Sequence, residues 1–155
     1  MRFSDSVLNE CGRTVYRTCL AKTADEELSR DILGDVFVLL FDKKPHFADK
    51  TALVVWMVRT ASRLIANHYR KERNISGIPL EDVNVPSPAD PLTFELLELL
   101  KSLPEKLRDV TVLYYIEDMS VKDISRCLGL AQGTVKSRLF HARELLTKTY
   151  KEEIL

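Results

Sequence analysis

Apolar residues recur at helical spacing along most of this chain, and no stretch alternates as a strand would. A first helix is predicted from the apolar positions Val7, Leu8, Cys11, Val15, Cys19 and Leu20. A second helix is predicted to begin after Thr23, which we take as its N-cap, with Glu26 in the capping-box position. Its inward face would consist of Leu28, Ile32, Val36, Phe37 and Leu40. A third extends from about Thr51 to Arg73, with an apolar face of Leu53, Met57, Ala61, Leu64, Ile65 and His68. The pattern therefore predicts an all-α fold.

The segment 74–91 breaks the helical pattern, because it contains four prolines and one glycine. We expect two small helical domains, residues 1–73 and 92–155, joined by this proline-rich linker. Asp90 is predicted to cap the next helix with Pro91 in its first turn, and a further helix is predicted to start within Ser102–Glu105. Apolar residues beyond it, Leu107, Val110, Leu113 and Tyr114, are expected to complete the core of the second domain.

The stretch from Ser120 to Leu146 predicts a helix-turn-helix. Ser120 is the expected cap of its first helix, with Asp123 in the capping-box position, and Gly129 is the expected turn. The second helix would bury Val135, Leu139, Ala142 and Leu146 and turn outward Gly133, Lys136, Ser137, Phe140 and His141, with Arg138 and Arg143 on its flanks. A solvated amphipathic helix is the alternative, but such a face rarely carries an aromatic residue such as Phe140. We therefore favour a helix that reads DNA.

The formal net charge of the 155 residues is zero, but the charges are segregated. Residues 25–42 are acidic, whereas residues 59–73 and 126–148 are basic. On the third helix, Arg59, Arg63 and Arg70 fall within about 40° of one another, with Asn67 and Trp56 beside them. Arginines can follow a phosphate backbone and an aromatic ring can stack on an unpaired base, so we favour DNA binding for this stripe. For Trp56 alone, packing against a neighbouring helix is the favoured role.

No catalytic or metal site is predicted. Cys11, Cys19 and Cys127 are odd in number and scattered, which favours buried reduced thiols over a disulfide or a metal site. His46, His68 and His141 lie far apart in the sequence and near no nucleophile, so we expect neither an enzyme nor a cofactor. No apolar run approaches the roughly 18 residues needed to cross a bilayer. The first residues lack the charged and apolar regions of a signal peptide. A cytoplasmic protein without membrane insertion is expected.

The chain resembles the extracytoplasmic-function (ECF) group of bacterial sigma factors, which keep only sigma regions two and four. The C-terminal half carries the strongest motifs: Leu103-Pro104-Glu105, Tyr114-Tyr115, Ile124-Ser125, Leu128-Gly129, Gly133 to Leu139, and Ala142-Arg143. The N-terminal half matches region two more loosely, at Asp35-Val36-Phe37, Phe47, Trp56-Met57, Arg59 and Tyr69-Arg70-Lys71. The resemblance covers nearly the whole chain.

The resemblance implies that region two docks on the clamp of core RNA polymerase and captures the −10 element, and that region four reads the −35 element and meets the polymerase flap. The polymerase-binding residues carried over are Asp31, Asp35 and Phe37. The implied −10 contacts are Phe47, Lys50, Thr51, Trp56, Arg59, Arg63, Asn67, Arg70 and Lys71, with the loop from Phe47 to Thr51 holding a flipped base. The implied −35 contacts are Gly133, Thr134, Lys136, Ser137, Arg138, Phe140, His141 and Arg143.

Some positions depart from the family pattern. Ala131 stands where a capping Ser or Thr is usual, which costs the recognition helix roughly 1 kcal/mol. Arg63 stands where many relatives have Asn, the −10 loop has Lys50 and no glycine, and His141 replaces a common arginine. The changes at Arg63 and in the −10 loop predict an unusual −10 preference.

The leading hypothesis is an initiation factor that binds core RNA polymerase and promoter DNA, with a possible anti-sigma factor as a further partner. One alternative is a stand-alone helix-turn-helix regulator, which would explain only the C-terminal half. Another is a sigma-like interaction module, suggested by the short chain and the divergent −10 loop.

Overall fold

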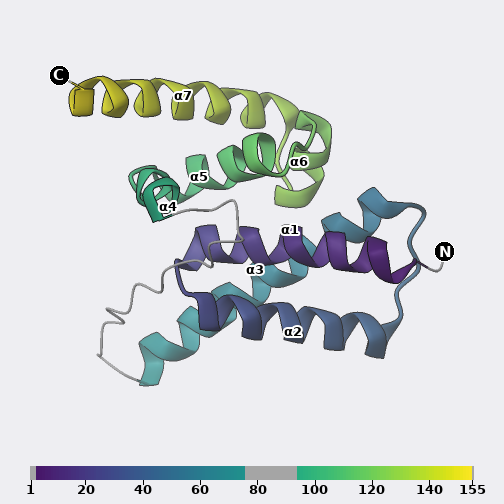
Figure 1. The fold of residues 1–155 in the computed structure, drawn as a ribbon. Helices are drawn as coiled ribbons and strands as arrows, with labels where there is room; N and C mark the ends of the chain where they lie inside the picture. Colours follow the sequence, from purple (N-terminus) through teal and green to yellow (C-terminus); the bar gives the residue numbers. More distant parts are fainter. Residues whose placement is uncertain (1–2, 76–93, 155) are drawn as a thin grey trace. The chain divides into compact units, whose positions relative to one another are not determined.

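The computed structural model describes residues 3–75 and 94–154, without the side chains of residues 73–75, 94 and 150–154. Within these residues the chain forms seven α-helices and one π-helical turn, and no strand is present there (Figure 1). The expected all-α class is confirmed. The chain divides into two compact units, Met1–Val85 and Pro86–Leu155, which are described separately.

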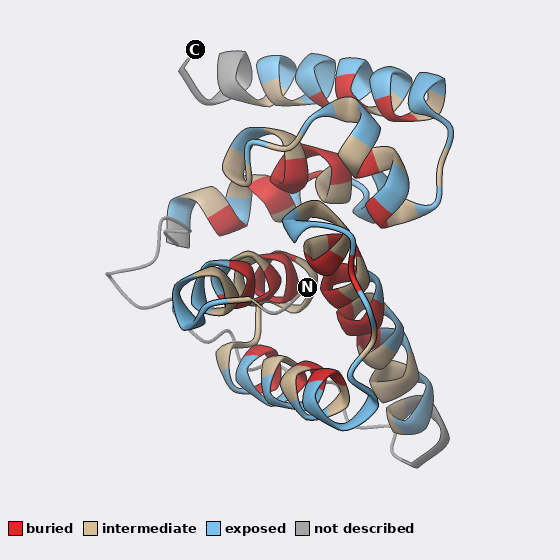
Figure 2. Ribbon diagram, turned by 90° about the vertical axis from the view of Figure 1, so that its right-hand side faces the viewer, coloured by how far each residue is buried: buried red, intermediate tan, exposed pale blue. Residues whose placement is uncertain are grey.

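The first unit consists of α1 (Asp5–Thr23), α2 (Glu26–Lys43) and α3 (Lys50–Ile75). Each of the three helices packs against the other two. The faces coloured as buried turn toward one another (Figure 2). The fully or nearly fully buried residues are Cys11, Val15, Cys19, Leu20, Leu28, Ile32, Val36, Leu40, Leu53, Met57, Val58, Ala61 and Ile65. Most of the predicted apolar faces are therefore confirmed, although Val7, Leu8, Phe37, Leu64 and His68 are only half-buried.

The prediction that Thr23 caps the second helix is wrong. The N-cap of α2 is Asp25, whose Oδ1 accepts a hydrogen bond from the backbone N–H of Leu28 at 3.0 Å. Thr23 is the last residue of α1, and its hydroxyl donates to the backbone oxygen of Cys19 at 2.9 Å. Asp25 is the better cap because its carboxylate also interacts favourably with the positive end of the helix dipole, while the threonine hydroxyl is satisfied within α1.

The second unit consists of α4 (Phe94–Lys101), α5 (Glu105–Thr111), the π-helical turn η1 (Val112–Ile116), α6 (Val121–Leu128) and α7 (Gln132–Ile154). The start predicted within Ser102–Glu105 corresponds to α5, whereas the predicted cap Asp90 and Pro91 lie outside the described residues. Arg108 links α4 to α5, because its Nε donates to the backbone oxygen of Leu100 at 3.0 Å and its Nη2 to that of Leu103 at 3.1 Å. The buried residues include Leu97, Leu100, Leu103, Val110, Leu113, Ile124, Val135, Leu139 and Ala142.

The helix-turn-helix has the predicted local geometry. The Ser120 Oγ accepts a hydrogen bond from the backbone N–H of Asp123 at 3.1 Å, which caps α6. Gly129 ends α6 with φ 66°, a left-handed conformation that glycine adopts without a steric penalty. The next residue, Leu130, donates its backbone N–H to the oxygen of Ser125 at 3.1 Å. These contacts fix the direction in which α7 leaves the turn.

The predicted domain and linker boundaries are only partly covered by the described residues. Helix α3 continues to Ile75, two residues beyond the predicted end of the first domain. The remainder of the linker 74–91 lies outside the described residues, and its role as a tether stays a prediction.

The uncapped start of α7 gives a first testable prediction. Ala131 precedes the helix and accepts the backbone N–H of Val135 at 3.1 Å, yet it has no side-chain oxygen. Replacing Ala131→Ser should stabilise the second unit by about 1 kcal/mol and raise its thermal unfolding midpoint by about 4 °C or more. Circular dichroism melts check this, with Ser120→Ala as the opposite control that removes a cap. No rise for Ala131→Ser beside a fall for Ser120→Ala would contradict the prediction.

Candidate nucleic-acid interface

The outward face of α7 is accessible in the second unit. Gly133, Lys136, Ser137, Phe140 and His141 are exposed, as their spacing predicted, and 55% of the Phe140 surface is accessible. Thr134 and Arg138 are half-buried, so their side chains are only partly available. An exposed aromatic ring beside a lysine and a serine is better suited to contact base edges and thymine methyl groups than to remain in contact with water.

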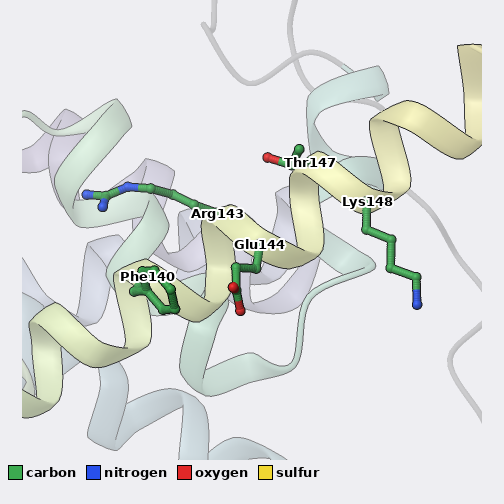
Figure 3. Close-up of a pocket in the computed structure, with 5 residues that line it drawn as sticks. All are labelled: Phe140, Arg143, Glu144, Thr147 and Lys148. Atoms are coloured by element: carbon green, nitrogen blue, oxygen red, sulfur yellow. The ribbon is translucent and has the colours of Figure 1, made fainter.

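Arg143 is exposed but already engaged within the unit. Its Nε donates to the Tyr115 hydroxyl at 2.5 Å, and its guanidinium carbon lies 5.8 Å from the Tyr115 ring centroid and 6.0 Å from that of Tyr114. On α7 itself, Phe140, Arg143, Glu144, Thr147 and Lys148 line an open hollow of about 620 Å³ (Figure 3). One edge of the Arg143 guanidinium is therefore held by Tyr115, a contact that sequence spacing did not reveal.

The basic stripe on α3 is present in the first unit. Arg59, Arg63, Arg70 and Lys71 are exposed and Asn67 is half-buried. Trp56 is half-buried, and its ring packs edge-on against Phe47 with 5.9 Å between centroids. Trp56 thus packs within its unit, as favoured, but the contact observed is with Phe47 in the loop before α3 and not with a neighbouring helix. Part of the Trp56 surface remains accessible beside the stripe.

The side chains of the loop before α3 do not form a simple open pocket. Phe47 is only 8% exposed and packs between Trp56 and Phe3, whose ring centroid lies 6.3 Å away. Its ring is therefore unavailable for direct stacking on a base while this packing persists. Thr51 is half-buried, and Asp49 accepts the backbone N–H of Ala52 at 2.8 Å, which caps the start of α3.

Lys50 has a partner that sequence reasoning missed. Its Nζ lies 2.6 Å from Oε1 of Glu10 on α1, and both side chains are about half-exposed. The Lys50 ammonium lowers the pKa of the Glu10 carboxyl through a hydrogen bond and through its charge. The two residues are 40 positions apart, so no local pattern could have predicted the pair.

Helix α2 carries an acidic surface with exposed apolar residues. Asp31 and Asp35 are exposed, and Phe37 is half-buried with its ring stacked on Phe41 at 6.0 Å between centroids. Phe41 is 58% exposed and Val38 66% exposed, which sequence reasoning did not single out. The sequence did contain a signal for this surface, because α2 has more large apolar residues than its inward face needs.

The predicted burial of the three cysteines is confirmed. Burial raises the pKa of the Cys19 thiol to about 12 and also raises that of Cys11. Among the residues that the structure describes, no group of His, Cys, Asp or Glu side chains is arranged to hold a metal ion. In the same part of the chain, no helix is both long and apolar enough to span a membrane.

Known proteins are similar to this chain along nearly its whole length. The family model for sigma-70 region 4 matches residues 93–146. The ECF RNA polymerase sigma factor SigM of Bacillus subtilis is 26% identical over 148 residues, with 90% of each chain covered. The SigW factor of the same organism is 24% identical over 156 residues, covering 89% of this chain and 83% of SigW.

A solved structure shares the fold. The sigma factor RpoE of Bartonella quintana, crystallised with the anti-sigma factor NepR, superposes with a TM-score of 0.77 at 21% identity, covering 93% of this chain and 94% of that chain. The C-terminal unit is thus of the sigma-70 region 4 class. Across nearly the whole chain, these similarities support an ECF sigma factor, a transcription initiation factor rather than an enzyme. The resemblance inferred from the sequence motifs is confirmed.

Proposed function

We propose that this sigma factor binds core RNA polymerase and divides promoter recognition between its two units. The observation that carries the proposal is the presence of an exposed basic surface on each compact unit, one along α7 and one along α3. Two separate cationic surfaces suit two contacts with one polyanion, although the summed charge of the chain is zero. The protein would act in the cytoplasm, where promoter DNA is found.

Helix α7 is the proposed reader of the −35 element. Lys136 and Ser137 lie in its first two turns, the part of a recognition helix that enters the major groove. Lysine donates to the O6 and N7 acceptors of guanine, and Phe140 offers an apolar contact for a thymine methyl. His141, in place of the arginine usual in the family, supplies fewer donors at this position.

The stripe on α3 is the proposed contact for the opened −10 strand. Its arginines and Lys71 would follow the phosphates, and the remaining surface of Trp56 would meet an unpaired base. Since Phe47 is buried between Phe3 and Trp56, it would shape the wall of a base pocket rather than stack on the base itself. Lys50 would exchange Glu10 for a phosphate, an exchange of one exposed ion pair for another that costs little.

Helix α2 is the proposed polymerase-binding surface. The exposed rings and methyls of Phe41 and Val38 give an apolar centre, and Asp31 and Asp35 supply charges for a basic partner. The clamp is the proposed partner of this surface, and the flap that of the second unit. A partner that covers either surface would keep the factor inactive, which is how an anti-sigma factor would act here.

Run-off transcription on a randomised promoter library tests the proposal. Core polymerase plus the purified full chain should yield transcripts that share two sequence elements, whereas core polymerase alone should not. A second sigma factor serves as the control for active core enzyme. If that control works and this chain yields no specific transcript, the proposal fails. Specific binding to a palindromic site without affinity for polymerase would support a stand-alone regulator.

Charge reversal on α2 is a second testable prediction. The double variant Asp31→Lys with Asp35→Lys should weaken binding to core polymerase by about 10-fold or more, because like charges would then face each other across the interface. The neutral double variant Asp31→Asn with Asp35→Asn should show a smaller loss. Binding is followed by fluorescence of a labelled sigma factor, and melting curves verify folding. Unchanged affinity in the charge-reversal variant would remove α2 from the proposed interface.

A further inference from the structure

Two adjacent tyrosines meet α7 at one arginine. Tyr114 and Tyr115 lie in η1, where the backbone N–H of Glu117 donates to the oxygen of Val112 at 3.0 Å, a five-residue spacing that defines a π turn. Their rings pack edge-on with 4.9 Å between centroids. Both rings lie within about 6 Å of the Arg143 guanidinium, the range of a cation–π contact.

The contacts of Arg143 leave part of its guanidinium available. The group has five donors in a fixed plane, and Nε donates to the Tyr115 hydroxyl. No hydrogen bond from its two terminal nitrogens is found in the part of the chain that the structure describes, and the residue is exposed. An arginine held in this way can offer its terminal edge to a second acceptor with two parallel hydrogen bonds. Glu144 also lines the nearby hollow, but no ion pair joins it to Arg143 among the described residues.

The position of Arg143 on α7 suits a contact with a DNA strand. Seven residues separate it from Lys136, so the two Cα positions lie on nearly the same side of the helix and about 10.5 Å apart along its axis. The major groove is about 12 Å wide. If Lys136 reaches a base edge, Arg143 reaches the phosphates that border the same groove.

We infer that Tyr115 is a positioning residue for DNA binding, which holds Arg143 so that its terminal nitrogens grip one phosphate beside the −35 element. The inference rests on the proposed function and adds a residue from η1 to the DNA-binding apparatus. A guanidinium fixed by a hydrogen bond and two rings loses less conformational freedom on binding than an untethered one. Tyr115, which is 54% exposed, thereby contributes to affinity without reading a base.

A mutant cycle on the holoenzyme tests the inference. The probe is a labelled duplex that contains the upstream element selected from the promoter library and ends before the −10 element. Tyr115→Phe should weaken binding about 5-fold in the wild-type background and leave binding unchanged in an Arg143→Met background. Arg143→Met should reduce the slope of log K against log salt by about 0.9, since one phosphate contact is lost. Arg143→Lys should keep the slope but bind more weakly.

Tyr114→Phe is the matched control, because the Tyr114 hydroxyl makes no hydrogen bond within the described residues. It should bind like the wild type, and melting curves show whether each variant is folded. Equal losses for Tyr115→Phe in both backgrounds, or an unchanged salt slope for Arg143→Met, would overturn the inference and leave the cluster a purely structural one. If the wild type gives promoter-specific transcription but Tyr115→Phe weakens binding equally in both backgrounds, only this inference is overturned. Absence of specific transcription by the wild type overturns both it and the proposed function.

Discussion

Replacing Lys136→Glu is expected to lower promoter-specific transcription by about 100-fold. A good two-point contact between a side chain and a base edge discriminates by about 1–3 kcal/mol, and a carboxylate in the same place adds repulsion from the neighbouring phosphates. Lys136 is exposed on the outward face of α7, and its side chain makes no hydrogen bond or ion pair with the described residues. Transcription from the selected promoter, measured beside binding to its upstream duplex, checks the prediction.

Lys148→Glu is the control for charge alone. Lys148 is exposed on the same helix but lies about 18 Å along the axis from Lys136, beyond the width of one major groove. We expect this variant to weaken binding only modestly and without changing the preferred upstream sequence. Lys136→Gln should give an intermediate loss. Equal losses for the two glutamate variants would mean that Lys136 contributes general attraction and no sequence recognition.

Leu20→Ala is expected to destabilise the first unit by about 2–5 kcal/mol. Leu20 is fully buried in α1, a helix that packs against both α2 and α3, so truncation leaves a cavity in the core of the first unit. Small domains have a free energy of unfolding of about 5–15 kcal/mol, and such a loss is a large fraction of it. Chemical denaturation followed by circular dichroism provides the measurement. Val38→Ala, at a position that is 66% exposed on α2, should change stability by no more than about 0.5 kcal/mol.

Hydrogen exchange locates the effect of Leu20→Ala. Amides of α1, α2 and α3 should lose protection, while those of α5, α6 and α7 should keep it, because the two units have separate cores. Loss of protection to the same extent in both units would show that they unfold together, contrary to this expectation.

Helical periodicity was sufficient to predict most of the buried faces, because one apolar stripe repeats every three or four residues on each helix. The cap at Ser120 and the turn at Gly129 were also predictable, since both depend on residue types at fixed short spacings. The cap of α2 was not: Thr23 and Asp25 are both good capping residues, and sequence alone did not show that the threonine hydroxyl bonds back within α1.

The candidate sites were less predictable than the fold. Exposure of the α7 face followed from periodicity, but the partners of its charged residues did not. Arg143 meets a tyrosine 28 positions away, and Lys50 meets a glutamate 40 positions away. Phe47 matched a family motif, yet its burial depends on Phe3 and Trp56 from other segments. Such pairings arise from tertiary packing, which a one-dimensional pattern does not encode.

The buried cysteines make the molecule its own chemical reporter. Burial raises the pKa of the Cys19 thiol to about 12, so the reactive thiolate is scarce at neutral pH, and burial also shields it from reagents. Alkylation of Cys11 and Cys19 would therefore proceed through opening of the first unit, and that of Cys127 through opening of the second. Labelling rates at these native positions would time the opening of each half separately, with and without polymerase, and without any engineered probe.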